Sequence, residues 1–444
     1  MRRLIEYINN NVLFKVASLN SASVLVRIIA GFFTSKAIAI YIGPEGMALI
    51  GNLRNFLTSV QSFATLGLYN GVVKYVAEFK SNTIELSKLI STVYYFGFIT
   101  TTIVCFLVYF NAEYLNSLVF LTYSKYTYIF KILALAIPFY SLNMLTFAIM
   151  NGYSKYRMLL IINMIGQVLG LCITLVLIYQ NNLDGALISV VISPSIIFLI
   201  TFVGIMNQRS LVSLIKADNI SFDFMKKLSA YSVMALVSAI ALPLVMINIR
   251  NYIGDHVGLQ EAGFWEAMNR ISTYYLMFVN SLMTLYILPR FSEINSAKEF
   301  RAEVFSFYKT IMPVFGVGLL VIYLLRPFII SIVFSKEFKP MEDLFLWQLL
   351  GDFVRVLSVV IAYQFIAKRM FWHFMISEIF SVIMIYATSV YFIDMYGVKG
   401  ATIAHFASYV LYFGIVLMIF SSKLFGPLPE NELQADESEV DEGE

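Results

Sequence analysis

Apolar runs long enough to cross a bilayer follow one another along the whole chain. A window of about 19 residues detects them, and a helix needs roughly 20 apolar residues to span the hydrocarbon. Half of the runs fall before the middle of the chain and half after it. The twelve predicted spans are 16–40, 46–77, 84–110, 126–150, 156–180, 184–206, 224–250, 260–290, 303–333, 341–368, 371–393 and 398–422.

The second run, 46–77, predicts one long helix with an arginine well inside it. Thr58, Gln61 and Thr65 follow Arg54 at helical spacing, so one face of this helix is polar. An arginine at the bilayer centre costs about 2.5 kcal/mol or more, and it is usually kept where it faces a wet cavity or a partner. Snorkelling to the outer head groups is the simpler alternative.

The same arrangement of charges recurs in the second half of the chain. Three charged residues of the first half each have a charged counterpart in the second half, always the same number of residues later. The pairs are Glu45 with Glu261, Arg54 with Arg270 and Lys74 with Arg290. The sequence therefore predicts two related halves that bring such helices together around one central cavity.

Composition places the chain in the membrane. It is 59% hydrophobic and 13% charged, whereas a typical soluble domain carries about 25% charged residues. Lysine and arginine crowd the loops on the side of both termini, about 18 against about 5 on the other side, which predicts cytoplasmic termini. We expect a first bundle over 1–206, a cytoplasmic linker over 207–223, a second bundle over 224–423 and a disordered acidic tail over 424–444.

Several chemistries find no support in the sequence. The loops predicted outside are too short for a catalytic domain, and no P-loop, HExxH or GxSxG pattern is present. We therefore expect no catalytic residues and no cofactor. Three distant histidines and two cysteines in apolar runs, Cys105 and Cys172, indicate neither a metal site nor a disulfide framework. The basic excess belongs to the membrane body, so nucleic acid is not an expected partner.

Basic residues also lie inside the first span. Arg27 is about ten residues in, or about 15 Å deep at 1.5 Å per residue, and Lys36 lies in the outer third of the span. The helical neighbours of Arg27 form a small and polar stripe, made of Asn20, Ser23, Gly31 and Thr34. Several guanidinium groups in one cavity suit a multiply charged anion such as pyrophosphate, whose oxygens they bind in a bidentate fork.

Acidic residues inside the later spans are candidates for coupling to an ion gradient. Glu266 stands four residues before Arg270, and Asp352 three residues before Arg355, so mutual neutralisation on one helix is the simpler interpretation of each pair. Glu378 has no basic residue three or four positions away. Glu266, Asp352 and Glu378 are therefore the predicted titrating groups.

Four segments carry a resemblance to a known family: Leu68-Tyr-Asn-Gly-Val-Val-Lys-Tyr-Val-Ala77, Gly263-Phe-Trp-Glu-Ala-Met-Asn-Arg-Ile-Ser272, Met341-Glu-Asp-Leu-Phe-Leu-Trp-Gln-Leu-Leu-Gly-Asp352 and Phe365-Ile-Ala-Lys368. They resemble the Wzx-type flippases, in the branch of the lipid III (enterobacterial common antigen) and O-antigen translocases. These belong to the multidrug/oligosaccharidyl-lipid/polysaccharide (MOP) exporter superfamily. The resemblance extends over roughly residues 14–423.

This resemblance implies two six-helix bundles, related by a pseudo-twofold axis, around a cationic central cavity. It implies that an undecaprenyl-pyrophosphate-linked oligosaccharide is exported across the bacterial inner membrane by alternating access. The implied partners are membrane lipids and, further, the glycan polymerase and chain-length regulator of the same pathway. Arg27, Lys36 and Arg54 stand where the family tends to carry basic residues. Arg270 is assigned to this predicted pyrophosphate site only because it is the counterpart of Arg54 in the internal repeat.

Two other functions remain open at this point. A cation-coupled multidrug exporter of the same superfamily would need an acidic or aromatic site for cationic substrates, and the deep arginines argue against it. A membrane glycan polymerase or ligase would need larger outside loops.

Overall fold

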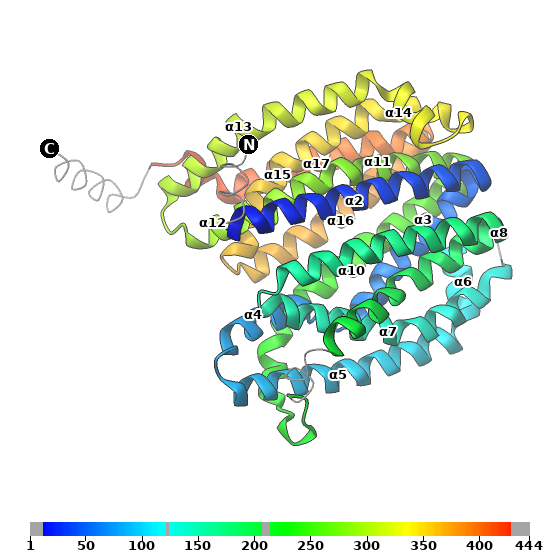
Figure 1. Cartoon of the computed structure of the whole chain (residues 1–444). Coiled ribbons are helices and arrows are strands. Elements are labelled where there is room, and N and C mark those ends of the chain that lie inside the picture. The colour runs from blue at the N-terminus through cyan, green and yellow to red at the C-terminus, as the bar shows by residue number, and fades with distance from the viewer. Residues whose placement is uncertain (1–11, 121–123, 207–213, 428–444) are drawn as a thin grey trace, which may run out of the picture. The chain divides into compact units, whose positions relative to one another are not determined.

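The computed structural model describes residues 12–120, 124–206 and 214–427, and these residues form helices and turns without a β-strand. The acidic tail beyond residue 427 and the linker residues 207–213 lie outside the described residues. The helices are α2 (Val12–Tyr41), α3 (Gly43–Ala64), α4 (Tyr69–Phe79), α5 (Thr83–Phe110), α6 (Ala112–Phe120), α7 (Thr127–Gly152), α8 (Tyr156–Met206), α10 (Phe222–His256), α11 (Leu259–Leu282), α12 (Leu288–Glu293), α13 (Ala297–Leu324), α14 (Arg326–Val333), α15 (Phe345–Ala367), α16 (Phe371–Tyr396) and α17 (Val398–Phe425) (Figure 1). The short elements η1 (Ser124–Tyr126), η2 (Ala217–Asn219), η3 (Met283–Ile287) and η4 (Lys336–Leu344) complete the order.

The chain divides into two compact units. Unit 1 comprises Met1–Asn251 together with Val333–Glu337, and unit 2 comprises Tyr252–Ile332 together with Phe338–Glu444. The five-residue segment of unit 1 thus comes from the second half of the sequence. The predicted bundle limits at 206 and 224 stay predictions.

The prediction of an all-helical membrane protein is confirmed. Ten described helical stretches are long and apolar enough to cross a membrane. One of them, Tyr156–Gly204, holds two helices that meet at Asn182, where the backbone turns to φ 48° and ψ −121°. The 22-residue α3 is absent from these ten stretches. The count of twelve spans therefore stays a prediction.

The single helix predicted over 46–77 is wrong. The helix ends at Ala64, and Leu66 and Gly67 adopt φ values of 52° and 60° before α4 begins. A Cβ on Gly67 would lie 3.0 Å from the carbonyl oxygen of Ser232, so the turn packs closely against α10. Apolar periodicity continues through this break, which is why the sequence pattern concealed it.

Turn geometry repeats between the two halves of the chain. Among the described residues, eight have positive φ, and six of them form three pairs, each 215 positions apart. A positive φ is unfavourable for most residues, so its recurrence at equivalent positions indicates turns that the fold requires. The pairs are Gly43 with Gly258, Ser154 with Arg369, and Asn182 with Gly397. This spacing supports the internal repeat that the charged residues predicted.

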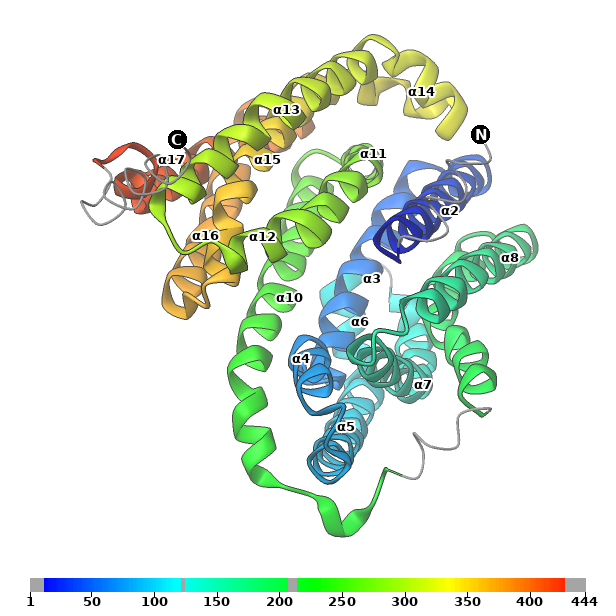
Figure 2. The same ribbon diagram turned by 60° about the vertical axis from the view of Figure 1, so that its left-hand side comes forward.

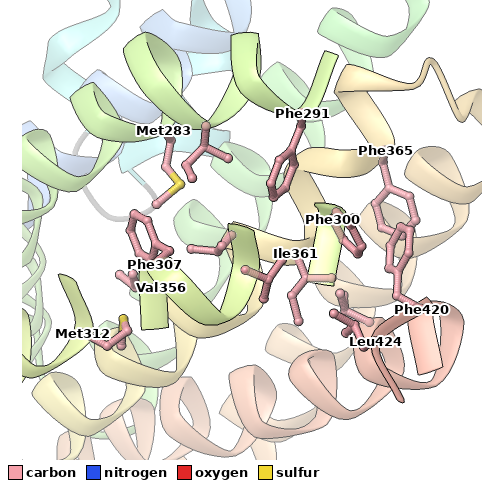
Figure 3. Close-up of a cluster of buried hydrophobic side chains, with 14 of the residues drawn as sticks. Met283, Phe291, Phe300, Phe307, Met312, Val356, Ile361, Phe365, Phe420 and Leu424 are labelled. Atoms are coloured by element: carbon pink, nitrogen blue, oxygen red, sulfur yellow. The ribbon is translucent and has the colours of Figure 1, made fainter. Parts of the chain in front are cut away.

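Helix α7 is central to unit 1, where it packs against α4, α5, α6 and α8 (Figure 2). In unit 2, α17 packs against α15 and α16. A cluster of buried aromatic and aliphatic side chains joins η3, α12, α13, α15 and α17 of unit 2 (Figure 3). Phe291, Phe300, Phe365 and Phe420 are among its members, and each is 2% exposed or less. The cluster includes residues of α11 and α15, two of the helices that carry the acidic residues considered below.

The close approach of α4 and α7 depends on a glycine, which gives a first prediction. A Cβ on Gly152 would lie 2.5 Å from Cβ of Val76 and 2.8 Å from the carbonyl oxygen of Val73. Small residues let membrane helices approach closely. We expect Gly152→Ala to force the helices apart and to cost about 1–3 kcal/mol of stability, measured by thermal unfolding in detergent.

The matched control is Gly414→Ala on α17, because a Cβ there meets nothing within 4 Å. This variant should melt like the wild type. Equal melting of both variants would contradict the close packing of α4 and α7.

Candidate functional site

Arg27 lies in the interior of α2, within the candidate membrane span Leu19–Tyr41. Its side chain is exposed, and no hydrogen bond or ion pair links its guanidinium to another residue of the described ranges. Ser23, one turn earlier, is buried, whereas Gly31 and Thr34 are partly buried. The predicted polar stripe is therefore only partly accessible, and Arg27 is its exposed charge.

Lys36 is engaged with the backbone. Its ammonium donates a hydrogen bond to the carbonyl oxygen of Phe334 at 2.5 Å, and Phe334 is fully buried in the segment Val333–Glu337 that belongs to unit 1. An ammonium so held offers less of its charge to a ligand. Its predicted role at the pyrophosphate is untested, and the contact gives it a structural role as well.

Arg54 on α3 is half-buried and interacts with a neighbouring group. Thr58 donates its hydroxyl to the carbonyl oxygen of Arg54 at 3.0 Å, and Thr65 donates to that of Gln61 at 2.9 Å. The predicted polar face of α3 thus exists, although part of its hydrogen bonding is satisfied within the helix itself.

A buried arginine that the sequence analysis did not single out lies next to α3. Arg250 on α10 is 3% exposed, and its Nη1 donates to Oδ1 of Asn52 at 2.6 Å. Asn52 in turn donates to Oδ1 of Asn251 at 2.7 Å and to the carbonyl oxygen of Val119 on α6 at 2.9 Å. A hydrogen bond to Asn52 on α3 therefore holds Arg250 inside unit 1. Its position at the end of an apolar run gave no sign of this.

Arg270 and Glu266 form an ion pair on α11, as their spacing predicted. Nε of Arg270 lies 3.1 Å from Oε1 of Glu266, and the side chains are 6% and 9% exposed. Nη1 and Nη2 of Arg270 are buried without a hydrogen-bond partner among the described residues. The pair is therefore neutral overall, yet one edge of the guanidinium keeps its donors unsatisfied. Such an edge has the geometry to bind two oxygens of an anion.

Asp352 on α15 is fully buried, and its hydrogen bonds go to other helices. Oδ1 lies 3.0 Å from Nε2 of His405 on α17, and Oδ2 accepts a hydrogen bond from the hydroxyl of Tyr275 on α11. Arg355 instead lies over the ring of Tyr409, 5.5 Å from its centroid. The simple pairing of Asp352 with Arg355 along one helix is therefore incomplete, and the sequence analysis missed His405.

Glu378 on α16 is half-buried. It is close enough to Arg355 to act on it electrostatically, as is Asp352. Unit 2 thus brings two of the predicted titrating acids, Asp352 and Glu378, to one cluster around Arg355. Glu266 lies elsewhere, in its pair with Arg270.

Charged side chains inside membrane-spanning helices are expensive in hydrocarbon and mark functional positions, so the helices of this chain are more than a passive anchor. A family profile described as "Polysaccharide biosynthesis protein" matches residues 37–343. The chain belongs to this family. The resemblance stated from the sequence segments is confirmed.

Curated relatives agree with this assignment. The chain is 28% identical over 421 residues to the lipid III flippase of Escherichia coli (strain K12), which covers 92% of this chain and 98% of the relative. It is 25% identical over 292 residues to a putative O-antigen transporter of Shigella flexneri, which covers 63% of this chain and 67% of the relative.

Solved structures share the fold. An inward-facing multidrug resistance MATE family transporter of the MOP superfamily matches with a TM-score of 0.73 at 13% identity, covering 93% of this chain and 99% of that chain. The lipid II flippase MurJ, in an inward closed conformation, matches with a TM-score of 0.69 at 17% identity, covering 91% of this chain and 87% of that chain. The fold is therefore that of the MOP transporters.

The buried pair on α11 yields a second prediction. Glu266→Gln leaves the Arg270 guanidinium buried without its counter-charge, so we expect a loss of about 3–5 kcal/mol in stability, seen as a lower unfolding temperature in detergent. Adding Arg270→Met to the same chain should restore most of this loss, because no buried charge then remains.

The control is a less buried pair of similar spacing. Glu85 and Lys88 lie 2.8 Å apart with side chains 33% and 40% exposed, so Glu85→Gln should cost at most about 1 kcal/mol. Similar losses in Glu266→Gln and Glu85→Gln would contradict a structural role for the buried pair.

Proposed function

We propose that this chain is a flippase that moves an undecaprenyl-pyrophosphate-linked oligosaccharide from the cytoplasmic to the periplasmic leaflet of the bacterial inner membrane. The names of the curated relatives and the MOP transporter fold support this substrate class. The observation that carries the proposal is Arg27, an exposed guanidinium in the interior of an apolar membrane-spanning helix, with no described partner.

The chemistry of the cargo explains such an arginine. A charge that faced lipid at this depth would be costly, whereas a charge in a water-filled cavity is solvated. Pyrophosphate oxygens can replace that water, and guanidinium binds them with two parallel hydrogen bonds. Arg54 and Arg270 are the further groups assigned to the pyrophosphate, together with Lys36, which is on the same helix as Arg27.

Alternating access would move this cargo without covalent chemistry. The bundles over 1–206 and 224–423, related by a pseudo-twofold axis, would rock about a central cavity while the lipid tail stays in the bilayer. The positive-inside bias of the loops supports cytoplasmic termini. Delivery outside would be to the glycan polymerase and chain-length regulator of the same pathway, whose association with this chain is part of the proposal.

The alternative functions are less well supported. The likeness to multidrug transporters shows only the shared fold, since its sequence identity is 13%. A knockout that loses drug resistance would favour a drug exporter. A knockout that accumulates unpolymerised glycan on the outer leaflet would favour a polymerase, whereas accumulation on the inner leaflet is expected for a flippase.

The test of the proposed site is replacement of Arg27. We expect Arg27→Ala to lower surface glycan roughly tenfold to hundredfold in a strain that lacks its own flippase, because a charge-assisted contact contributes about 1.5–3 kcal/mol. The measurements are surface glycan and the lipid-linked intermediate on the inner leaflet, at membrane protein levels equal to the wild type. Arg54→Ala should act in the same direction.

Arg157→Ala is the matched control, because Arg157 is an exposed arginine in the first turn of α8. It should leave export unchanged. Arg27→Lys should retain part of the activity, since it keeps the charge without the fork. Full export by Arg27→Ala would refute the assigned role.

A further inference from the structure

A cavity lies between α5 and α7 of unit 1, although the two helices pack side by side (Figure 1). Its volume is about 460 Å³, and pockets that hold small molecules measure about 300–1,000 Å³. The lining extends from Tyr94 to Phe110 on α5 and from Ala134 to Leu145 on α7. None of the charged residues of the candidate site belongs to this lining. The cavity is therefore a separate feature of unit 1.

Short side chains on the facing sides of the two helices create this space. They are spaced three or four positions apart, which puts them on one face of each helix. Protein interiors are otherwise close-packed, so facing rows of short side chains leave room for atoms from outside the chain. The short lining residues are Gly97, Thr101 and Cys105 on α5, and Ala134, Pro138 and Ser141 on α7.

Large apolar side chains form the walls of the cavity and are exposed. Phe98, Phe106 and Phe110 on α5 and Leu135 on α7 line it, and each is 59% exposed or more. Both helices are candidate membrane spans, and exposed apolar side chains on such helices mark a surface that contacts membrane lipid. The cavity is therefore a groove that opens toward lipid, and it is called the α5–α7 groove below.

The floor of the groove offers little hydrogen bonding to an occupant. Thr101 donates its hydroxyl to the carbonyl oxygen of Ala64 at 3.0 Å, and Thr102 donates to that of Phe98 at 2.8 Å. Ser141 keeps a buried Oγ without a partner among the described residues, which leaves one hydroxyl on an otherwise apolar floor. A hydrocarbon chain suits such a surface, because it loses no hydrogen bond on leaving the bilayer.

One end of the groove is closed by direct contact between the helices. A Cβ on Gly97 would lie 2.6 Å from Cδ1 of Leu145, so α5 and α7 approach closely at this level. The hydroxyl of Tyr94 lies 2.9 Å from Oγ1 of Thr146 beside it. An occupant of the groove therefore ends at this contact.

The other end of the groove carries a positive charge. Nζ of Lys131 on α7 lies 5.8 Å from the ring centroid of Tyr109, which lines the groove. Lys131 is exposed and has no ion-pair partner in the part of the chain that the structure describes. Asp184, an acid near this end of α7, accepts the hydroxyl of Tyr128 instead. Lysine and tyrosine side chains at the end of a span suit the level of the lipid head groups.

The length of the groove matches one leaflet of a bilayer. Lys131 precedes Leu145 by fourteen residues on α7, or about 21 Å at 1.5 Å per residue. Half of a bilayer with its head groups measures about 20–22 Å. The distance from the ammonium to the closed end is therefore that of one phospholipid from its phosphate to the end of its chain.

We propose that the α5–α7 groove binds one anionic phospholipid of the surrounding membrane, with an acyl chain between the helices and its phosphate at Lys131. The undecaprenyl tail of the proposed cargo is much longer than one leaflet, so the closed end at Gly97 and Leu145 argues against it as the occupant. This inference concerns binding of a membrane lipid and does not depend on the proposed transport function.

The test is native mass spectrometry of the full chain in detergent, offered equal amounts of phosphatidylglycerol and phosphatidylcholine with the same acyl chains. We expect the wild type to retain one phosphatidylglycerol, with a preference of roughly fivefold, the factor that one lysine near an anionic membrane surface contributes. Equal retention of the two lipids by the wild type would overturn the proposal.

Lys131→Gln should remove the preference and leave the two lipids equally bound. The matched control is Lys125→Gln, because Lys125 is also exposed and its ammonium lies over the ring of Tyr126, outside the lining of the groove. This control should keep the wild-type preference. A preference that persists in Lys131→Gln, or that is lost equally in Lys125→Gln, contradicts the assignment of the phosphate to Lys131.

Cys105→Phe should fill the groove and reduce retention of both lipids. Its matched control is Ile103→Phe, which adds a ring to α5 at an exposed position outside the lining. Unchanged retention in Cys105→Phe places the lipid elsewhere and overturns the proposal. If Cys105→Phe does not fold, the exposed substitution Lys131→Gln decides the test.

Competition distinguishes a phospholipid from the tail of the cargo. Undecaprenyl phosphate, added at the concentration of phosphatidylglycerol, should not displace it from the wild type. Displacement that disappears in Cys105→Phe would assign the groove to an isoprenoid chain and overturn the phospholipid as its occupant. Glycan export by the wild type is a separate measurement, and its failure would overturn the proposed function without changing these lipid ratios.

Discussion

The structure is governed by the cost of placing charge in a low-dielectric membrane interior, where each ionised group needs a partner or water. Three charged groups of the helices have such a partner. Arg270 pairs with Glu266, Arg250 donates to Asn52, and Lys36 donates to a backbone carbonyl. Arg27 differs, because its guanidinium is exposed within an apolar helix and has no described partner. That contrast separates charges that hold the fold together from one available to a ligand.

The two halves of the chain have turns of positive φ at equivalent positions. Three pairs of positive-φ residues recur at a spacing of 215, in positions where helices end or reverse. Between these turns the halves diverge. The first half breaks its second span at Leu66 and Gly67, whereas the second half continues through the π-helical turn η3 at Met283–Ile287. The related helices that carry Arg54 and Arg270 therefore differ in how they end. Such π-helical turns often occur at functional sites.

The two units differ in the charges that they carry inside their helices. On α2 and α3 of unit 1, the notable charges are cations, which suit a diphosphate cargo. In unit 2, the buried carboxylate of Asp352 contacts His405 and Tyr275, and both Asp352 and Glu378 act electrostatically on Arg355. These contacts join α11, α15, α16 and α17 through polar side chains.

The sequence by itself determined the class of protein, the helical architecture and the family. Length and apolarity fix a membrane span locally, and spacing along one helix predicted the Glu266–Arg270 pair correctly, because residues four apart on a helix must be neighbours. Tertiary structure alone decided the partners that come from other helices. His405 is 53 residues from Asp352, and Arg250 is 198 residues from Asn52. Helical periodicity tells which face a side chain occupies, but it does not tell which helix will meet that face. The sequence also failed to predict the break after α3, for a related reason. Gly67 is required there by its close approach to α10, and the local pattern of apolar residues contains no sign of that contact.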